Sequence, residues 1–437
     1  MRQWKDGSKS MRERYRIVAY RPMHWLKRNL RPSWRKLRRM PHRVNLFAVR
    51  IAVRIFPLIA IERHRLYPPA RYCSTTAEWI STAGNDINAS ITRVDAASIV
   101  SNPLPKTIHK GVRQQFLTDE TYAYPETFVA TIPRGRVLKR GLVITPDGQL
   151  LQDVSTYFPD PPETLASSIS VEWKFEKLTP IEGRVAVLTT DGANLYYHWL
   201  FQLLPRFELI RRAGIETSRI DYFVVNSQKS RFQRETLALL GIDHAKIIAS
   251  DQVPYLTARE LVVPSVPLGG GCFRPWMTDF LRASFLSMNH KKIRSSGRRL
   301  YISRAKAGYR RVLNEPDVVE LLRRRGFETA AFETLSVSQQ AAAMASCDAV
   351  VAPHGGGLSN IVFCSPGTKV IEIFSPELVA GYFWKLSNQM NLDYYYLLGK
   401  GAPATLQVDY PQSWNAGTDI EVDLEMLEKT LTLANIS

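Results

Sequence analysis

The stretch DAVVAPHGGGLSNIVFCSPGTKVIEIF, residues 348–374, contains the signals that decide the fold. A short apolar run ends at Pro353, three glycines follow a histidine, and SNIVFC predicts a short helix before the strand KVIEIF. A strand, a glycine-rich turn, a helix and a second strand form the repeating unit of a parallel sheet. The turn then lies at the carboxyl edge of the sheet, where the unpaired N–H groups of the helix favour an anion.

The same alternation continues on both sides of this stretch. Strands are expected in VAVLTT, IDYFVV, KIIA, ELVVP and LYIS, and helices in 193–213, RFQRETLALLG, EPDVVELLRRRG and QQAAAMASC. Ser336 and Gln339 form a capping-box pattern, Asn314 is a candidate N-cap, and residues 137–153 predict a hairpin that turns at Pro146-Asp147-Gly148. The fold class is therefore α/β.

We predict two Rossmann-like domains that face a cleft, separated near the glycine-rich loop SVPLGGGCFRP. The first covers residues 111–267 and the second covers residues 268–437. A basic, partly amphipathic N-terminal extension, residues 1–110, precedes them.

Positive charge is concentrated at the N-terminus. The chain has a formal net charge of +18, and its first 71 residues hold 20 Lys/Arg against 3 Asp/Glu. The excess basicity is therefore a property of the N-terminal segment rather than of the two domains.

An apolar stretch, NLFAVRIAVRIFPLIAIER, begins at residue 45 within this segment. Arg50, Arg54 and Pro57 argue against a bilayer-crossing helix, because a central arginine costs about 2.5–3.5 kcal/mol to insert. The stretch instead suits a helix lying on an anionic membrane surface, contacted through residues 1–71. The alternative is a mobile basic arm or an amphipathic helix packed on the protein's own body, and nucleic acid is the weakest option because no reading motif accompanies the charge. No export signal opens the chain, so we expect a cytoplasmic protein, peripheral at the inner face of the plasma membrane.

Metal-binding patterns are absent from the sequence. The four cysteines show no CxxC spacing and no histidine partners, and no DxD sequence occurs. We therefore expect no metal site and no cofactor.

The glycine-rich turn supplies the first candidate binding residues. Glycines let a phosphate approach the backbone without interference from Cβ atoms, and a nearby amide can add a hydrogen bond. The alternative is a turn that serves only packing. The candidates from this turn are His354, Gly355, Gly356, Gly357 and Asn360.

Charged residues near two strand ends extend this candidate site. Glu372, on KVIEIF, is predicted to accept hydrogen bonds from ribose hydroxyls, with pairing to a nearby arginine as the alternative. Arginines after the strand LYIS suit bidentate binding of a pyrophosphate. Arg304 ranks first, Arg311 second and Arg310 third.

The candidate catalytic residue is His198, near the start of the helix predicted at 193–213. It shares one helix face with Gln202, four residues later, and its position after a strand end places it at the cleft. A histidine with an ordinary pKa near 6.5 can accept a proton from a hydroxyl group. A core histidine packed among Tyr196, Tyr197 and Trp199 is the alternative.

Three ordered motifs resemble glycosyltransferase family 61: LYYHWLFQLLPRFELI, LYISRAKAGYRRVLNEPDVVELLRRRGFE and SQQAAAMASCDAVVAPHGGGLSNIVFCSPGTKVIEIF. The resemblance covers about residues 137–400. It implies a GT-B fold, an inverting mechanism and a nucleotide-sugar donor held mainly by the C-terminal domain. It places Arg304, Arg311, His354, the three glycines and Asn360 at donor-side positions, and His198 at an acceptor-side position. Many relatives have an acidic residue where Gln202 stands, and HGA where this chain has HGG.

The resemblance implies a hexosyl- or pentosyltransferase that acts on a glycan or glycolipid acceptor in surface polysaccharide or capsule biosynthesis. A UDP-sugar is the expected donor, and arginines would replace a metal ion. Two alternatives are a polysaccharide pyruvyltransferase-like enzyme and a non-catalytic, membrane-associated scaffold of polysaccharide assembly.

Overall fold

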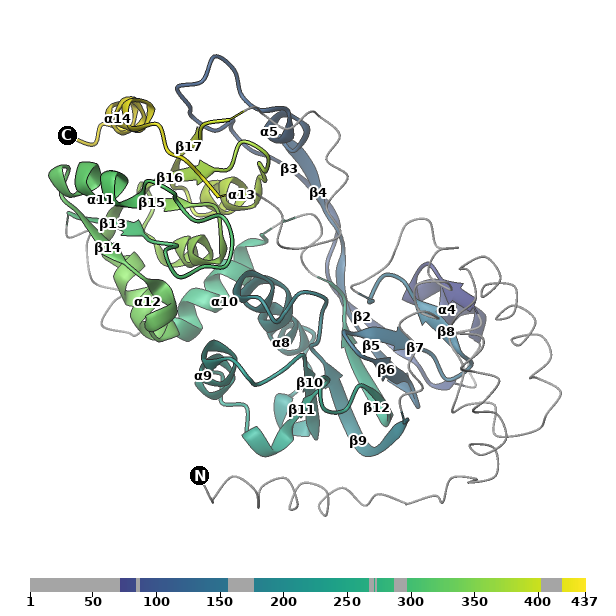
Figure 1. The fold of residues 1–437 in the computed structure, drawn as a ribbon. Helices are drawn as coiled ribbons and strands as arrows, with labels where there is room; N and C mark the ends of the chain where they lie inside the picture. The colour runs from purple at the N-terminus through teal and green to yellow at the C-terminus, as the bar shows by residue number, and fades with distance from the viewer. Residues whose placement is uncertain are drawn as a thin grey trace, which may run out of the picture.

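The computed structural model describes residues 71–83, 87–155, 177–266, 271, 273–286, 297–401 and 419–437. The predicted membrane-surface helix lies outside these residues. Within them, no helix combines the length and the apolar character needed to cross a bilayer. The protein is a mixed α/β structure with two large sheets and a two-stranded ribbon (Figure 1).

The first sheet has ten strands, and its parallel part follows the predicted alternation. Strands β9 (Thr179–Val187), β10 (Tyr222–Val225), β11 (Ile247–Ala249) and β12 (Tyr255–Pro264) lie in the order β12-β9-β10-β11. Strand β9, the first of these four in the chain, thus lies between β12 and β10. This is the arrangement of half of a doubly wound sheet. The crossovers contain α8 (Leu204–Arg212) and α9 (Arg231–Leu239).

Antiparallel strands extend the other edge of this sheet. They are β5 (Thr127–Pro133), β6 (Arg136–Leu138), β7 (Leu142–Ile144) and β8 (Gln149–Leu151). The hairpin predicted at 137–153 is therefore a three-stranded meander. Lys139 and Gly141 both adopt positive φ, which supplies a chain reversal that the sequence pattern did not reveal.

Part of the predicted N-terminal extension belongs to this sheet. Strand β1 (Arg71–Cys73) pairs with β8, β2 (Ser90–Asp95) pairs with β5, and α4 (Thr76–Ala83) connects them. The indole of Trp79 is fully buried and donates to Asp147 in the β7–β8 turn. Residues from 71 onward therefore fold with the first domain, although we predicted an extension that ends at residue 110.

The second sheet is wholly parallel, with five strands. They are β13 (Arg298–Ile302), β14 (Phe327–Ala330), β15 (Cys347–Pro353), β16 (Lys369–Phe374) and β17 (Asp393–Leu398), in the order β14-β13-β15-β16-β17. This is the other common doubly wound order, in which the winding direction reverses between the first and third strands. That reversal lies between β13 and β15.

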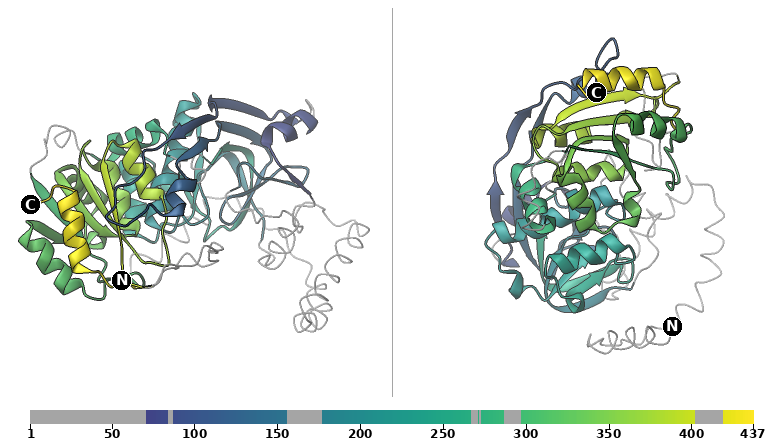
Figure 2. Two further views of the ribbon diagram at one scale, coloured as in Figure 1. Left: turned by 90° about the horizontal axis from the view of Figure 1, so that it is seen from above. Right: turned by 90° about the vertical axis from the view of Figure 1, so that its left-hand side faces the viewer.

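Helices α11 (Glu315–Arg324), α12 (Val337–Ala345), α13 (Tyr382–Gln389) and α14 (Leu424–Leu433) flank this sheet (Figure 2). The capping box predicted at Ser336 and Gln339 is confirmed at the start of α12. Asn314 precedes α11, but its side chain bonds the backbone of Val422 instead of capping the helix. Short 3₁₀ turns occur at Thr217–Arg219, His244–Lys246 and Phe332–Thr334.

Residues 98–124, here called the strap, run from the first sheet to the second (Figure 1). Strands β3 (Ser98–Ser101) and β4 (Thr121–Tyr124) form its ribbon, and α5 (Gln114–Thr118) lies at its far end. Lys106 bonds the outer strand β17 through the backbone of Tyr394 and Tyr396. Phe116 of α5 packs against Trp384 of α13, with ring centroids 5.3 Å apart. The strap therefore covers the free edge of the second sheet.

One hydrophobic cluster joins the two sheets. It includes Leu188 and Phe201 of the first part and Ile302 and Leu358 of the second. Helix α10 (Pro275–Phe285) lies between the sheets and contacts both α8 and the 3₁₀ helix η8 (Gly356–Phe363) (Figure 1). The two parts therefore share a continuous core.

Arg206 of α8 ties together the carboxyl ends of the central strands in the first sheet. Its side chain is fully buried, and its guanidinium donates to the backbone oxygens of Thr189 after β9, Pro264 at the end of β12, and Val154. Burial lowers the pKa of this guanidinium. The three carbonyl groups have their oxygens turned inward, so the arginine satisfies acceptors that water cannot reach.

We expect Arg206→Met to lower the free energy of unfolding by about 2–5 kcal/mol, because each orphaned buried acceptor costs about 1–3 kcal/mol. Arg211→Met, on the exposed side of the same helix, removes only a surface ion pair and should cost about 1 kcal/mol or less. Urea denaturation followed by circular dichroism measures both. Equal midpoints for the two variants would contradict this role of Arg206.

Candidate functional site

The winding direction of the second sheet reverses between β13 and β15, and doubly wound sheets bind ligands outside the carboxyl ends of such strands, a position here called the crevice. Ser303 and Arg304 follow β13, and His354 and the three glycines follow β15. The topology therefore brings the predicted arginine and the predicted glycine turn to the same place.

The glycine turn fits against an arginine. Gly355 has extended backbone, and a Cβ atom there would lie 1.9 Å from Nη1 of Arg304. At Gly357 the nearest atom to such a Cβ is a side-chain carbon of Ile302, at 3.0 Å. The glycine at 355 therefore makes room for a guanidinium, whereas we predicted that these glycines make room for a phosphate. The helix that follows is 3₁₀ rather than α.

Two arginines lie close together in this crevice. Arg304 donates from Nε to the backbone oxygen of Arg310 and from Nη2 to that of Tyr309, at 3.2 and 2.9 Å. Both guanidinium carbons lie over the ring of Tyr309, 5.4 Å from its centroid for Arg304 and 4.8 Å for Arg310. Burial lowers the pKa of both groups, and the charge of Arg310 further lowers the pKa of Arg304.

Arg310 is the most constrained member of the pair. Its φ of 54° is left-handed, which costs a non-glycine residue about 1 kcal/mol or more, and only 8% of the residue is exposed. Its Nε has no hydrogen-bond partner. Within the described part of the chain, no carboxylate lies within ion-pairing distance of either guanidinium. The charges of Glu333 and Glu372 favour the protonated forms of Arg304 and Arg310 from a longer distance, but neither carboxylate forms an ion pair with them.

Arg311, which we ranked above Arg310, has a different position. Its Nε and Nη2 both donate to Oδ2 of Asp419, at 3.1 and 2.7 Å, and half of its side chain is exposed. The backbone reversal at Arg310 explains the difference, since it turns that side chain inward and its neighbour outward. The sequence pattern RR does not show which arginine points inward.

Glu372 is also placed differently from the prediction. The residue is fully buried, one carboxylate oxygen bonds Nδ1 of His354, and the other accepts a hydrogen bond from Tyr394. Neither oxygen is left for a ribose hydroxyl. Glu372 instead orients His354, whose ring stacks on Phe374 with centroids 5.1 Å apart.

Asn360 connects the two parts of the protein. Its Oδ1 accepts a hydrogen bond from Tyr196 at 2.9 Å, and its Nδ2 donates to Gln340 at 2.8 Å and to the backbone oxygen of Gly357 at 3.1 Å. Asn360 has no exposed surface, and Tyr196 is partly buried. The amide therefore fixes the glycine turn against the first domain, whereas we predicted a contact with a ligand.

His198 lies at the end of α7 (Tyr196–His198), just before a π-helical turn, η3 (Trp199–Leu203). The residue is 8% exposed, and its Nδ1 lies 2.9 Å from Oε1 of Gln202. Burial lowers the pKa of the imidazole, while Gln202 and the charge of Asp191 raise it. A ring that loses its proton more readily is neutral over more of the physiological pH range, as a general base requires.

The helix that holds His198 meets the glycine turn of the second domain. A Cβ atom at Gly356 would lie 3.9 Å from Cβ of Tyr196. The rings of Tyr197 and His354 both contact Phe383, at 5.8 and 5.5 Å between centroids. His198 and the arginine pair thus border the same junction between the domains.

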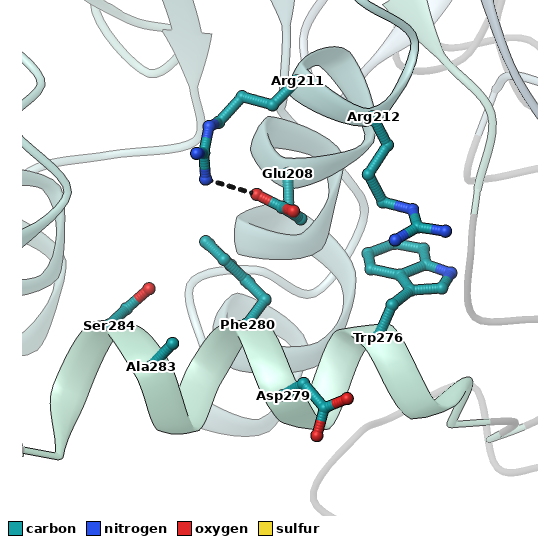
Figure 3. Close-up of a pocket in the computed structure, with 8 residues that line it drawn as sticks. All are labelled: Glu208, Arg211, Arg212, Trp276, Asp279, Phe280, Ala283 and Ser284. Carbon is teal, nitrogen blue, oxygen red and sulfur yellow. Dashed lines mark hydrogen bonds and ion pairs between the residues drawn. The ribbon is translucent and has the colours of Figure 1, made fainter.

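A second hollow, an open groove between α8 and α10, lies away from this junction (Figure 3). Its lining residues include Glu208 and Arg212 at the far end of α8, and Trp276 with Phe280 on α10. Glu208 is ten residues beyond His198 along one helical path, roughly 15 Å at 1.5 Å per residue. Arg212 stacks on Trp276, 5.2 Å from its ring, and Arg211 forms an ion pair with Glu208 (Figure 3).

No group of three or more His, Cys, Asp or Glu side chains is arranged to hold a metal ion in the parts of the chain that the structure describes. Cys73, Cys347 and Cys364 are buried, and burial raises the pKa of each thiol. The polar groups of the crevice are instead guanidinium and imidazole groups, which suit an anionic ligand.

We expect Gly355→Ala to displace the Arg304 guanidinium and to weaken binding of inorganic pyrophosphate by about tenfold or more, because a charged hydrogen bond contributes about 1.5–3 kcal/mol. Gly308→Ala, in the loop between Arg304 and Arg310, meets nothing within 4 Å and serves as the control. Isothermal titration calorimetry compares the two variants. Equal affinities would show that the contact between Gly355 and Arg304 does not shape the site.

The comparison with known families agrees with this placement. Residues 196–371 match the model of the Glycosyltransferase 61 family, a range that begins at Tyr196 and ends just before Glu372. No curated protein matches the chain. The match includes His198, both arginines and the glycine turn, and it supports the assignment of this region, residues 196–371, to glycosyltransferase family 61.

Proposed function

We propose that this glycosyltransferase moves a sugar, with inversion at the anomeric carbon, from a nucleoside-diphosphate sugar to a hydroxyl group of a glycan or glycolipid. The two sheets with their doubly wound orders are compatible with a GT-B arrangement, in which a donor domain and an acceptor domain face each other. The donor would bind the second sheet at the β13–β15 crevice, and the acceptor would approach from the side of His198.

The observation that carries this proposal is the pair of neighbouring arginines, neither of which forms an ion pair with a described carboxylate. Like charges that share a buried site raise the free energy of the folded protein, unless a bound anion compensates them. A diphosphate brings two negative charges on adjacent phosphorus centres, and guanidinium groups bind such oxygens with directed hydrogen bonds. Arg304 and Arg310 would therefore bind the diphosphate of the donor and stabilise it as it leaves. With these charges in place, the transfer would need no metal ion.

His198 is proposed as the general base. In a single displacement, its imidazole takes the proton of the acceptor hydroxyl while that oxygen forms a bond to the anomeric carbon. The bond between this carbon and the diphosphate oxygen breaks at the same time, and the electron pair leaves with the nucleoside diphosphate. Attack from the face opposite the leaving group inverts the configuration.

The biological setting follows from the donor chemistry and the N-terminal charge. Nucleotide sugars are made in the cytoplasm, and an enzyme that builds a surface polysaccharide or capsule on a lipid carrier works at the inner membrane face. A basic segment, residues 1–71, would attract the enzyme to anionic lipids. A UDP-sugar is the proposed donor.

Neighbouring arginines provide a matched test of the donor site. We expect Arg310→Ala to weaken UDP binding by about 10- to 100-fold, because each charge-assisted contact contributes about 1.5–3 kcal/mol. Arg311→Ala should change it less than about threefold, because this side chain is bound to Asp419 at the surface. Calorimetry with UDP, GDP, dTDP and CMP, each with EDTA, measures the affinities.

The reverse ranking, with Arg311→Ala the weaker binder, would contradict the proposed donor site. Binding of phosphoenolpyruvate in place of every nucleotide would instead support a pyruvyltransferase. If no ligand binds folded protein, the scaffold alternative is favoured.

Replacing the base should affect turnover but not donor binding. We expect His198→Ala to lower kcat by about 10²–10⁴-fold, the usual contribution of a general base, with unchanged affinity for UDP. His244→Ala, in a surface 3₁₀ turn, controls for loss of an imidazole. Release of UDP in the presence of acceptor reports turnover. Near-normal turnover in His198→Ala would exclude His198 as the base.

A further inference from the structure

Gln202 is held from two sides by groups near the carboxyl edge of the first sheet. Its Oε1 lies 2.9 Å from Nδ1 of His198 and accepts a hydrogen bond from Thr190 Oγ1 at 3.2 Å. Thr190 is fully buried, and its backbone exchanges two hydrogen bonds with the side chain of Asn226 after β10. A chain of contacts therefore runs from the sheet through Thr190 and Gln202 to the histidine.

The local helix geometry makes this contact possible. His198 and Gln202 are four residues apart across the π-helical turn Trp199–Leu203, and π turns often occur at functional sites. Gly192, with φ of 76°, packs closely against the imidazole, since a Cβ atom there would lie 2.9 Å from Cδ2 of the ring. The ring therefore has little freedom to rotate away from Gln202.

An amide oxygen can only accept hydrogen bonds, so its partner nitrogen must carry a proton. With Nδ1 protonated, the neutral ring has its lone pair on Nε2, and Nε2 is the nitrogen that can remove a proton. The opposite tautomer would present an N–H group to the acceptor hydroxyl and could not act as a base.

We propose that Gln202 is a positioning residue that holds His198 in the tautomer protonated on Nδ1, so that Nε2 serves as the base. This inference rests on the proposed function of His198 and deepens it. During transfer, the acceptor proton moves to Nε2, the ring becomes an imidazolium ion, and the Nδ1–H group keeps its bond to Gln202. The positive charge then spreads over a ring whose Nδ1 contacts a neutral amide.

Other charged groups near His198 define the setting for its titration. Asp191, on the turn after β9, favours the protonated ring through its charge, and it forms an ion pair with Arg140 at 2.9 Å. Arg140 is mostly exposed, and its positive charge offsets that of Asp191. Tyr197 contacts the ring edge-on at 5.2 Å. A carboxylate at position 202 would therefore add one negative charge next to a nearly balanced pair.

Gln202→Glu tests the electrostatic part of the proposal. A carboxylate beside Nδ1–H keeps the tautomer and stabilises the imidazolium ion, so the folded-state pKa of His198 rises. The rate falls as pH decreases through this pKa, and we expect the acidic limb of the kcat profile to move up by about one to two pH units. Gln115→Glu, on an exposed face of α5, adds the same charge elsewhere and should leave the profile unchanged.

Gln202→Ala tests the tautomer itself. Without the acceptor, the ring divides between its two tautomers, and kcat should fall by about 10- to 100-fold, as for other outer partners of a working histidine. The affinity for UDP should stay within about twofold of that of the unchanged protein. Gln202→Glu should restore part of the lost rate above the new pKa.

A measurement on the unchanged protein keeps the proposal testable if a variant does not fold. In protein labelled with ¹⁵N-histidine, and with the His198 signal assigned through His198→Ala, we expect the chemical shifts of a ring protonated on Nδ1. Shifts of a ring protonated on Nε2 would overturn the proposal, and so would unchanged pH profiles in both Gln202 variants. If His198→Ala itself keeps its turnover, the proposed base is wrong and the role of Gln202 falls with it.

Discussion

Electrostatic repulsion between Arg304 and Arg310 is the constraint that organises the second domain's crevice. Two guanidinium groups share one tyrosine ring and are mostly withdrawn from water. Several features hold them there: the left-handed backbone of Arg310, the carbonyl groups that receive Arg304, and the glycine that leaves space for its guanidinium. Local strain of this kind persists where the surrounding structure fixes it, and it marks positions that are organised before the ligand arrives.

The junction between the domains is also held by defined side-chain contacts. A partly buried hydrogen bond from Tyr196 to Asn360 connects the histidine's helix to the glycine turn, and the hydrophobic cluster continues across it. The positions of the proposed base and of the proposed anion site are therefore coupled through packed side chains. An active site built this way gains precision, since small shifts of a catalytic group cost large factors in rate.

Sequence reasoning predicted the α/β class, most of the central strands and the junction of an arginine with a glycine turn. These follow from apolar runs, glycines and helix caps, which act locally. The sequence did not reveal the inward turn of Arg310, because a single positive φ decides between neighbouring arginines. It also did not reveal the partners of Glu372 and Asn360 within the fold. Whether a polar side chain meets a ligand or another side chain depends on Tyr394, Tyr196 and Gln340, which come from distant segments.

The strap is synthesised early but contacts a strand that is synthesised near the end of the chain. Residues 98–124 leave the ribosome long before β17, yet Lys106 forms its backbone bonds with Tyr394 and Tyr396, almost 290 residues later. Contacts of such long range slow folding, and until β17 appears the apolar face of α5 has no partner. Conversely, a second half produced on its own would expose the edge of β17, which is a template for strand-to-strand association. The two halves of this enzyme therefore depend on each other for solubility as well as for chemistry.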